Sequence, residues 1–156
     1  MLSYIEDQTI QAKRWIILLI VGVGTALSAF TFNAILIATP NIVTDYGITG
    51  LDVAWVQTAF MLTSTCLMVL SGKLGDSFGK FKMFKLGLII LTLGLVLGGF
   101  KSSFQVLIIS RVIQGIGSVL SMSINFAIAE ELFKREERGK AFGIIASFLS
   151  GGGIFG

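Results

Sequence analysis

The feature that most constrains the fold is a series of long, uncharged apolar runs separated by short polar segments. The first of these runs extends from Trp15 to Ala38 without a charged residue. An α-helix rises about 1.5 Å per residue, so this run is long enough to cross the ~30 Å hydrocarbon core of a bilayer. Hydrophobic residues make up 54% of the 156 residues, more than a soluble domain of this size can bury. The sequence therefore predicts an all-α integral membrane protein.

The apolar runs define five predicted helices. We expect a polar amino-terminal segment at residues 1–14 and a helical bundle at residues 15–156. The predicted helices lie at about residues 15–38, 53–71, 84–100, 104–129 and 141–156. The last run has only 16 residues. As a helix it would rise about 24 Å, less than the ~30 Å core, so we expect the chain to be the front portion of a longer polypeptide.

The positive charges predict how the helices are oriented. Of the 12 Lys and Arg residues, ten lie in the amino-terminal flank, the turn after the second run and the loop after the fourth run. The other two are Lys101 and Arg111. By the positive-inside rule the amino terminus is cytoplasmic, in a multi-pass protein of the cell membrane. Basic residues placed beside apolar runs favour lipid orientation, so no nucleic-acid partner is expected.

The segment Gly72–Lys85 is the one dense polar passage between two long apolar runs. Four lysines surround a single carboxylate, that of Asp76. Glycines at positions 72, 75 and 79 remove side chains where two helix ends approach and the backbone turns tightly. The pattern predicts a short, basic, cytoplasmic turn between the second and third helices.

Small and polar side chains follow one face of the fourth predicted helix. They recur at intervals of three or four residues, at Ser110, Gln114, Gly117, Ser121 and Asn125. At 3.6 residues per turn they form one stripe, which is either a packing seam or the wall of a wet cavity. The neighbouring Arg111 is a charge within the span and favours the cavity. With Thr31 and Asn33 of the first helix, Gln114, Ser121 and Asn125 are candidates to line a substrate path.

Glycine spacing predicts close packing of the third helix. Gly94 and Gly98 are four residues apart, and Gly87 falls near the same face. This small-xxx-small spacing lets two helix backbones approach closely.

Enzymatic chemistry has little support in the sequence. Histidine is absent, and the single cysteine, Cys66, lies inside an apolar run. A zinc site, a disulfide framework and a Cys/His nucleophile are therefore not indicated. The chain also lacks a Gly-x-x-x-x-Gly-Lys-Ser/Thr loop, the phosphate-binding sequence of many ATP-using proteins. We expect no cofactor, no metal and no catalytic residue.

Two segments resemble signatures of the major facilitator superfamily, in particular its fourteen-helix drug:proton antiporters. The segment Gly72-Lys-Leu-Gly-Asp-Ser-Phe-Gly-Lys-Phe-Lys82 is similar to the signature between helices 2 and 3, with matches at Gly72, Asp76, Gly79, Lys80 and Lys82. Arg111-Val-Ile-Gln-Gly-Ile-Gly117 resembles the signature of helix 4, with matches at Arg111, Gln114, Gly115 and Gly117. The spacing of Gly152 and Gly156 resembles the opening of the antiporter signature in helix 5.

The resemblance implies two helical bundles around a cavity that opens alternately to each side of the membrane. It implies a cytoplasmic latch in which Asp76 lies near a helix amino terminus and basic side chains, with Arg135 and Arg138 as candidate partners. It also associates Arg111 with proton coupling. A guanidinium stays charged at physiological pH, so Arg111 would bias the protonation of a nearby carboxylate and would not carry the proton itself.

One position departs from the antiporter pattern. These exporters often carry an aspartate nine residues before the proline that corresponds to Pro40, and this chain has Thr31 there. Asp45, Asp52 and Asp76 all fall in predicted turns. A proton-carrying carboxylate is therefore expected in the missing carboxy-terminal part of the polypeptide, or at a position that the sequence does not identify.

The leading hypothesis is a secondary active transporter that exports drugs or other small amphipathic molecules by proton-coupled alternating access. Its partners would be the small-molecule substrate, protons, the lipid bilayer and the remainder of the same polypeptide. The alternatives are a small membrane bundle without transport activity, acting as an assembly or scaffold module, and a non-functional truncated remnant. An open reading frame that continues beyond Gly156 into further apolar spans would favour the transporter.

Overall fold

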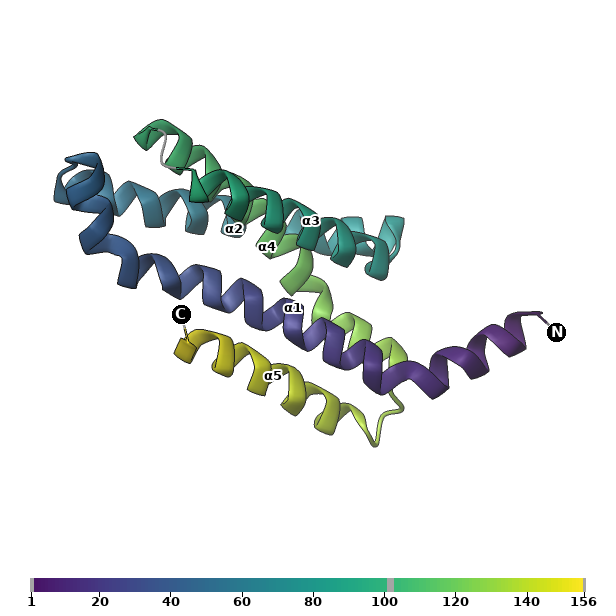
Figure 1. Ribbon diagram of the computed structural model, residues 1–156. Coiled ribbons are helices and arrows are strands. Elements are labelled where there is room, and N and C mark those ends of the chain that lie inside the picture. The colour runs from purple at the N-terminus through teal and green to yellow at the C-terminus, as the bar shows by residue number, and fades with distance from the viewer. Residues whose placement is uncertain (1, 101–102, 156) are drawn as a thin grey trace.

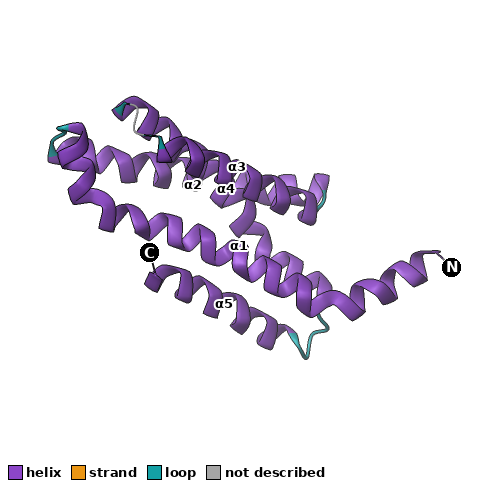
Figure 2. Cartoon of the chain, in the orientation of Figure 1, coloured by secondary structure: helices purple, strands orange, loops and turns teal. Residues whose placement is uncertain are grey.

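The computed structural model describes residues 2–100 and 103–155, and within them all regular structure is helical (Figure 2). The helices are α1 (Leu2–Tyr46), α2 (Gly50–Phe78), α3 (Lys80–Gly99), α4 (Phe104–Leu132) and α5 (Arg138–Phe155). Four segments are long and apolar enough to cross a membrane: Lys13–Tyr46, Gly50–Phe78, Lys80–Gly99 and Phe104–Leu132. The predicted all-α membrane fold is confirmed.

Helix α4 lies at the centre of the bundle. It packs against α2 and α3 on one side and against α1 on the other, while α5 lies alongside α1 (Figure 1). Side chains along 61% of its most apolar stretch are buried, compared with 17% in α2 and 28% in α3. The functional residues predicted on α4 are therefore surrounded by neighbouring helices.

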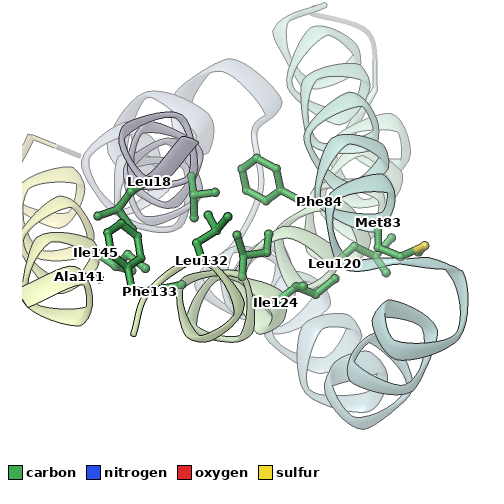
Figure 3. Close-up of a cluster of buried hydrophobic side chains, with 12 residues drawn as sticks. Leu18, Met83, Phe84, Leu120, Ile124, Leu132, Phe133, Ala141 and Ile145 are labelled. Carbon is green, nitrogen blue, oxygen red and sulfur yellow. The ribbon is translucent and has the colours of Figure 1, made fainter. Parts of the chain in front are cut away.

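An apolar cluster joins four of the helices (Figure 3). Leu18 of α1, Phe84 of α3, Ile124 of α4 and Ile145 of α5 are all at most 3% exposed. The outward faces carry exposed apolar side chains, including Val69, which is 73% exposed. Exposed apolar faces of this extent fit a protein whose surroundings are lipid.

The α3–α4 contact is a backbone-to-backbone approach through glycine, as predicted from the spacing of Gly94 and Gly98. A Cβ placed on Gly94 would lie 2.9 Å from the backbone nitrogen of Gln114. One placed on Gly87 would lie 2.7 Å from the backbone nitrogen of Ser121. These distances are shorter than van der Waals contact, so no larger residue fits without moving the helices apart.

The break between α2 and α3 is a single residue, so the prediction of a fourteen-residue turn over Gly72–Lys85 is wrong. Gly79 has φ of 96°, in the left-handed region that favours glycine, and the chain is helical on both sides of it. Gly75 lies inside α2, where a Cβ would be 3.1 Å from Ile124, and Gly72 has open space around it. The charged residues of this segment fit into helices because most of their side chains, including those of Asp76 and Lys82, lie on the exposed surfaces of α2 and α3.

Helix α1 is longer than predicted at both ends. It begins at Leu2, within the segment expected to be a polar tail, and its amino-terminal part projects past the other helices (Figure 1). It also passes through Pro40 to Tyr46, where we expected an outer loop. Proline lacks a backbone N–H, so the helix loses the one hydrogen bond that residue 40 would donate to the Leu36 carbonyl, and it stays helical on both sides.

Local capping explains where α2 and α4 begin. At the start of α2, the carboxylate of Asp52 accepts hydrogen bonds from the backbone nitrogen (2.9 Å) and the hydroxyl (2.8 Å) of Thr49. At the start of α4, the hydroxyl of Ser103 accepts a hydrogen bond from the backbone nitrogen of Val106 at 3.4 Å. Both contacts satisfy donors that a helix amino terminus leaves free. The expected outer turn includes Lys101 and Ser102, which lie outside the described residues.

Candidate functional site

The centre of the candidate site is Arg111, a buried charge on α4 that is 3% exposed. Its Nη1 donates to the side-chain oxygen of Gln114, and Gln114 in turn donates to the backbone oxygen of Gly94 on α3 at 3.1 Å. The guanidinium carbon lies 5.6 Å from the ring centroid of Phe60 on α2, a cation–π contact. The Nε atom is buried and has no acceptor within the described residues.

A cavity of about 250 Å³ lies beside this guanidinium, between α1, α3 and α4. Thr31, Arg111 and Gln114 all line it, so the structure brings together three residues that sequence analysis named separately. Apolar side chains, including Phe30 and Leu107, form much of the rest of the wall. The hydroxyl of Thr31 donates to the Leu27 carbonyl at 2.8 Å, which leaves its oxygen lone pairs as the polar feature available to a ligand.

The carboxy-terminal part of the polar stripe on α4, at Ser121 and Asn125, packs against α1. The side-chain nitrogen of Asn125 donates to the hydroxyl of Thr25 at 2.5 Å, and the Ser121 and Ser28 hydroxyls are 3.4 Å apart. Ser121 is 0% and Asn125 1% exposed. At Ser121 and Asn125 the stripe is a packing seam between α1 and α4, and the assignment of these two residues to a substrate path stays a prediction.

Asn33 and the remaining signature glycines lie at other helix contacts. The side-chain nitrogen of Asn33 donates to the backbone oxygen of Ala29 at 3.1 Å. A Cβ on Gly115 would meet the Phe60 carbonyl oxygen of α2 at 2.9 Å. One on Gly117 would collide with the backbone of α3, and one on Gly152 with the backbone of α1 at Ala26. These glycines allow close helix contact. Gly156 lies outside the described residues.

Sequence analysis missed a second hollow, a groove of about 640 Å³ between α2 and α4. Its lining combines aromatic rings, methionines and hydroxyl groups: Phe60, Ser64, Thr65, Met68, Ser118, Met122, Ser123 and Phe126. The Ser123 hydroxyl also lies 2.6 Å from the hydroxyl of Ser71 on α2. Serine, threonine and methionine recur in both apolar runs, and this recurrence was the sequence signal for the groove. It was not sufficient, because the sequence does not show that α2 and α4 face each other.

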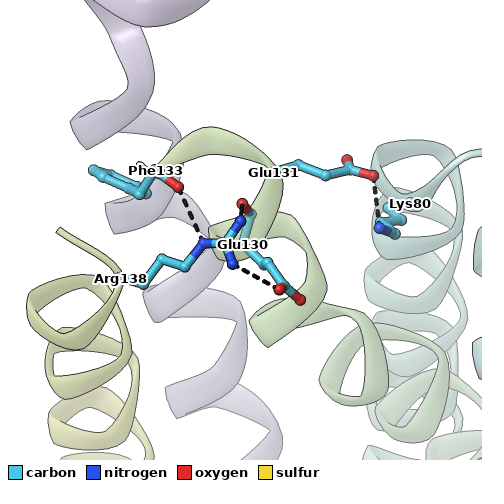
Figure 4. A network of polar contacts seen from close by, with 5 residues as sticks. All are labelled: Lys80, Glu130, Glu131, Phe133 and Arg138. Atoms are coloured by element: carbon cyan, nitrogen blue, oxygen red, sulfur yellow. Dashed lines mark hydrogen bonds and ion pairs between the residues drawn. The ribbon is translucent and has the colours of Figure 1, made fainter. Parts of the chain in front are cut away.

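Ion pairs join several helices at one end of the bundle, and we call them the charged layer (Figure 4). Lys80 at the start of α3 pairs with Glu131 of α4 at 2.6 Å. Arg138 at the start of α5 pairs with Glu130 at 2.8 Å and also donates to the backbone oxygen of Phe133 at 3.3 Å. These ion pairs thus join the end of α4 to the starts of α3 and α5.

Helix α1 joins the charged layer through Arg14. This guanidinium donates two hydrogen bonds to the carboxylate of Glu137, at 2.7 and 3.0 Å, in a bidentate pair. It also lies 5.3 Å from the ring centroid of Phe133, whose ring packs against Trp15 at 4.7 Å between centroids. Helix α1 is therefore fixed at Arg14 and Trp15 to the segment between α4 and α5.

Of the predicted latch residues, Lys80 and Arg138 form ion pairs. Asp76 and Lys82 are exposed on α2 and α3, and Arg135 is exposed in the loop before α5. Among the described residues none of these three has an ion pair. An Asp76–arginine latch stays a prediction, and Arg138 is engaged by Glu130 in this conformation.

Comparison with known protein families identifies the fold. The sequence pattern of the Major Facilitator Superfamily matches residues 21–156. The chain belongs to this superfamily. Relatives of the chain within this superfamily include proteins named as transporters.

Similar curated members of the superfamily come from bacteria. The chain is 34% identical over 144 residues to the riboflavin transporter RibZ of Clostridioides difficile, covering 92% of this chain and 32% of RibZ. It is 34% identical over 147 residues to multidrug resistance protein 3 of Bacillus subtilis, covering 94% of this chain and 28% of that protein. Multidrug transporter protein MdtP of the same organism is 31% identical over 147 residues, with 94% and 27% coverage. The chain therefore spans about a third of the length of these curated relatives.

Proposed function

We propose that the chain is part of a secondary transporter that exports drugs or other small amphipathic molecules by proton-coupled alternating access. The observation that carries this proposal is the groove of about 640 Å³ between α2 and α4. Met68, Met122 and Phe126 offer a soft apolar surface, and the serine and threonine hydroxyls offer scattered hydrogen bonds. Such a surface suits amphipathic ligands of varied shape. Relatives named as a multidrug resistance protein and as a multidrug transporter support the same substrate class.

Proton coupling is proposed to involve the region of Arg111, Gln114, Gly115 and Gly117. A fixed positive charge in a buried site favours the ionised form of a carboxylate that comes near it. Within the described spans, the carboxylates of α1, α2 and α4 lie toward helix ends. We therefore assign proton carriage to a carboxylate elsewhere in the transporter.

The latch is proposed to lie at the α2–α3 junction, with Asp76 as its acidic member and the exposed Arg135 as a partner. The ion pairs Lys80–Glu131 and Arg138–Glu130 support the idea that charges at these helix ends regulate how the bundle opens. The distribution of Lys and Arg supports a cytoplasmic location for this end and for the amino terminus, in the cell membrane.

The proposal is tested with Asp76→Asn in the full-length protein. Uptake of ethidium into inverted membrane vesicles, driven by a proton gradient, should fall at least about tenfold while the amount of membrane-inserted protein is unchanged. Glu136→Gln is the matched control, because it removes one carboxylate charge from an exposed loop position in the same charged region. It should leave uptake within about twofold.

Two results would contradict the proposal. Unchanged uptake in Asp76→Asn would show that the latch is assigned to the wrong residue. Uptake that persists after a protonophore collapses the gradient would show that transport is not coupled to protons.

A further inference from the structure

The side chain of Gln114 connects α4 to α3 and at the same time holds the buried charge of Arg111. Gln114 is 4% exposed, and its side-chain nitrogen donates to the backbone oxygen of Gly94 on α3 at 3.1 Å. Its side-chain oxygen accepts a hydrogen bond from Nη1 of Arg111. The amide therefore uses its donor and its acceptor in two different directions, and both contacts are buried.

Glycines of α3 provide the space that this amide occupies. A Cβ on Gly94 would lie 2.8 Å from Cγ of Gln114, and one on Gly98 would lie 3.2 Å from its side-chain nitrogen. Both distances are shorter than the optimal separation of non-bonded heavy atoms, so the side chain fits here because positions 94 and 98 carry no side chain. The packing thus keeps Gln114 directly against the α3 backbone.

Hydrogen-bond chemistry sets the orientation of the amide. A backbone carbonyl can only accept a hydrogen bond, and a guanidinium can only donate one. The oxygen of Gln114 must therefore face Arg111 and its nitrogen must face Gly94, since a reversed amide would place donor against donor and acceptor against acceptor. The Gly94 carbonyl is part of α3 and is held by that helix. It therefore anchors the amide whose oxygen receives Arg111.

The other contacts of Arg111 leave its guanidinium less firmly held. The ring of Phe60 on α2 lies 5.6 Å from the guanidinium carbon, but a ring supplies no oxygen acceptor for the N–H groups. Nε has no acceptor, and no ion pair of Arg111 occurs among the described residues. A long side chain retains rotamer freedom unless contacts fix it. Gln114 is therefore the contact on which the position of this charge depends.

No titratable side chain of a neighbouring helix faces the guanidinium in the part of the chain that the structure describes. Its neighbours are Thr31 on α1, Phe60 on α2 and the backbone of Gly94, through the amide, on α3. The carboxylates of α1, α2 and α4 lie toward helix ends. The positive charge is therefore not neutralised locally, and it can act on a carboxylate in the rest of the transporter.

We propose that Gln114 is a positioning residue for proton coupling. Its amide holds the guanidinium of Arg111 against α2 and α3, and so fixes the distance from which this charge acts on the proton-carrying carboxylate. The inference rests on the proposed proton-coupled transport and gives Gln114 a role within it. A fixed positive charge favours the ionised form of a carboxylate, so the pH dependence of transport reports where Arg111 is held.

The test measures ethidium uptake into inverted vesicles by the full-length protein over a series of pH values, at a constant pH difference across the membrane. At low pH the carboxylate stays protonated and cannot release its proton, so the midpoint of this acidic limb reports its ionisation. Gln114→Leu removes both hydrogen bonds and releases the guanidinium. The positive charge then favours ionisation less, and the midpoint should rise by at least about 0.5 pH unit.

A second substitution tests whether Gln114 acts through Arg111. In protein that carries Arg111→Lys, the forked guanidinium is already absent, so adding Gln114→Leu should move the midpoint by less than about 0.2 pH unit. A merely structural role of Gln114 would lower the amount of folded protein or the maximal rate of uptake. It would not move the midpoint, and it would not depend on the residue at position 111.

Gln114→Asn keeps the test decisive if Gln114→Leu does not fold, because it retains an amide in the buried site. Its side chain is one methylene shorter and cannot reach both partners, so the midpoint should again rise, by at least about 0.3 pH unit. Ser71→Ala is the matched control. Ser71 is 1% exposed and its hydroxyl lies 2.6 Å from that of Ser123 on α4, so the variant loses a buried contact between helices away from Arg111. Its midpoint should stay within about 0.2 pH unit of the unmodified protein.

Two results would overturn the inference alone. They are protonophore-sensitive uptake with an unchanged midpoint in the Gln114 variants, and an equal shift by Gln114→Leu with and without Arg111→Lys. Failure of the proposed function has a different signature. Uptake by the unmodified protein that is absent, or that persists after a protonophore, would refute proton-coupled export and this inference together.

Discussion

The α3–α4 contact makes a quantitative prediction for Gly87→Ala. The new Cβ would lie 2.7 Å from the Ser121 nitrogen and 2.8 Å from the Gly117 oxygen, both backbone atoms. Optimal separations between non-bonded heavy atoms are about 3.5–4.0 Å, so the two helices must separate by up to about 1 Å. Overpacking of this kind costs about 1–3 kcal/mol. The higher helix propensity of alanine returns at most about 1 kcal/mol.

Gly143→Ala is the control that isolates the steric effect. Gly143 lies inside α5, where a Cβ would meet nothing within 4 Å, so the variant gains the same helix propensity without the collision. The free energies of unfolding of the two variants should therefore differ by about 1–3 kcal/mol, with Gly87→Ala the less stable. Titration of dodecyl maltoside micelles with sodium dodecyl sulfate, followed by helical circular dichroism, measures this difference. Equal stability of the two variants would refute the account of α3–α4 packing.

Two further predictions concern polar contacts between helices. Asn125→Ala removes the hydrogen bond to Thr25 and should lower the free energy of unfolding by about 0.6–1.7 kcal/mol, since interhelical hydrogen bonds in membranes fall in that range. The same titration measures this change. An unchanged midpoint would show that the Asn125–Thr25 contact does not stabilise the packing of α1 against α4. For the Lys80–Glu131 pair, a double-mutant cycle with alanine should give a coupling energy of about 0.2–1 kcal/mol that shrinks at high salt, because Glu131 is half exposed. A coupling energy well above that range would show that the pair is shielded from solvent.

The number and class of helices could be predicted from the sequence because hydrocarbon imposes a length and a composition on each span. The apolar run from Trp15 to Ala38 is sufficient to place a membrane helix there. The ends of helices were less predictable. Glycine and lysine suggested a turn over residues 72–85, but in that segment only Gly79 leaves helical geometry, because charged side chains can remain on an exposed helical surface.

The composition of the candidate site was predictable, and its geometry was not. Arg111 and Gln114 were identified from one helix, and Thr31 was identified from another as a departure from the antiporter pattern. That these residues share one cavity depends on how α1 crosses α4, which no local pattern encodes. The polar stripe shows the same limit, because Asn125 on a helix face is equally compatible with a wet cavity and with a bond to Thr25.

The one-residue junction at Gly79 has a mechanical consequence. With one residue between them, the end of α2 and the start of α3 stay together in any movement, and close contacts at Gly87 and Gly115 hold α3 and α2 to α4. Helices α1 and α5 form the other unit, joined to each other where α5 crosses Ala26. Any displacement of one unit against the other would therefore break both the Thr25–Asn125 hydrogen bond and the Arg138–Glu130 ion pair, because both cross between the units.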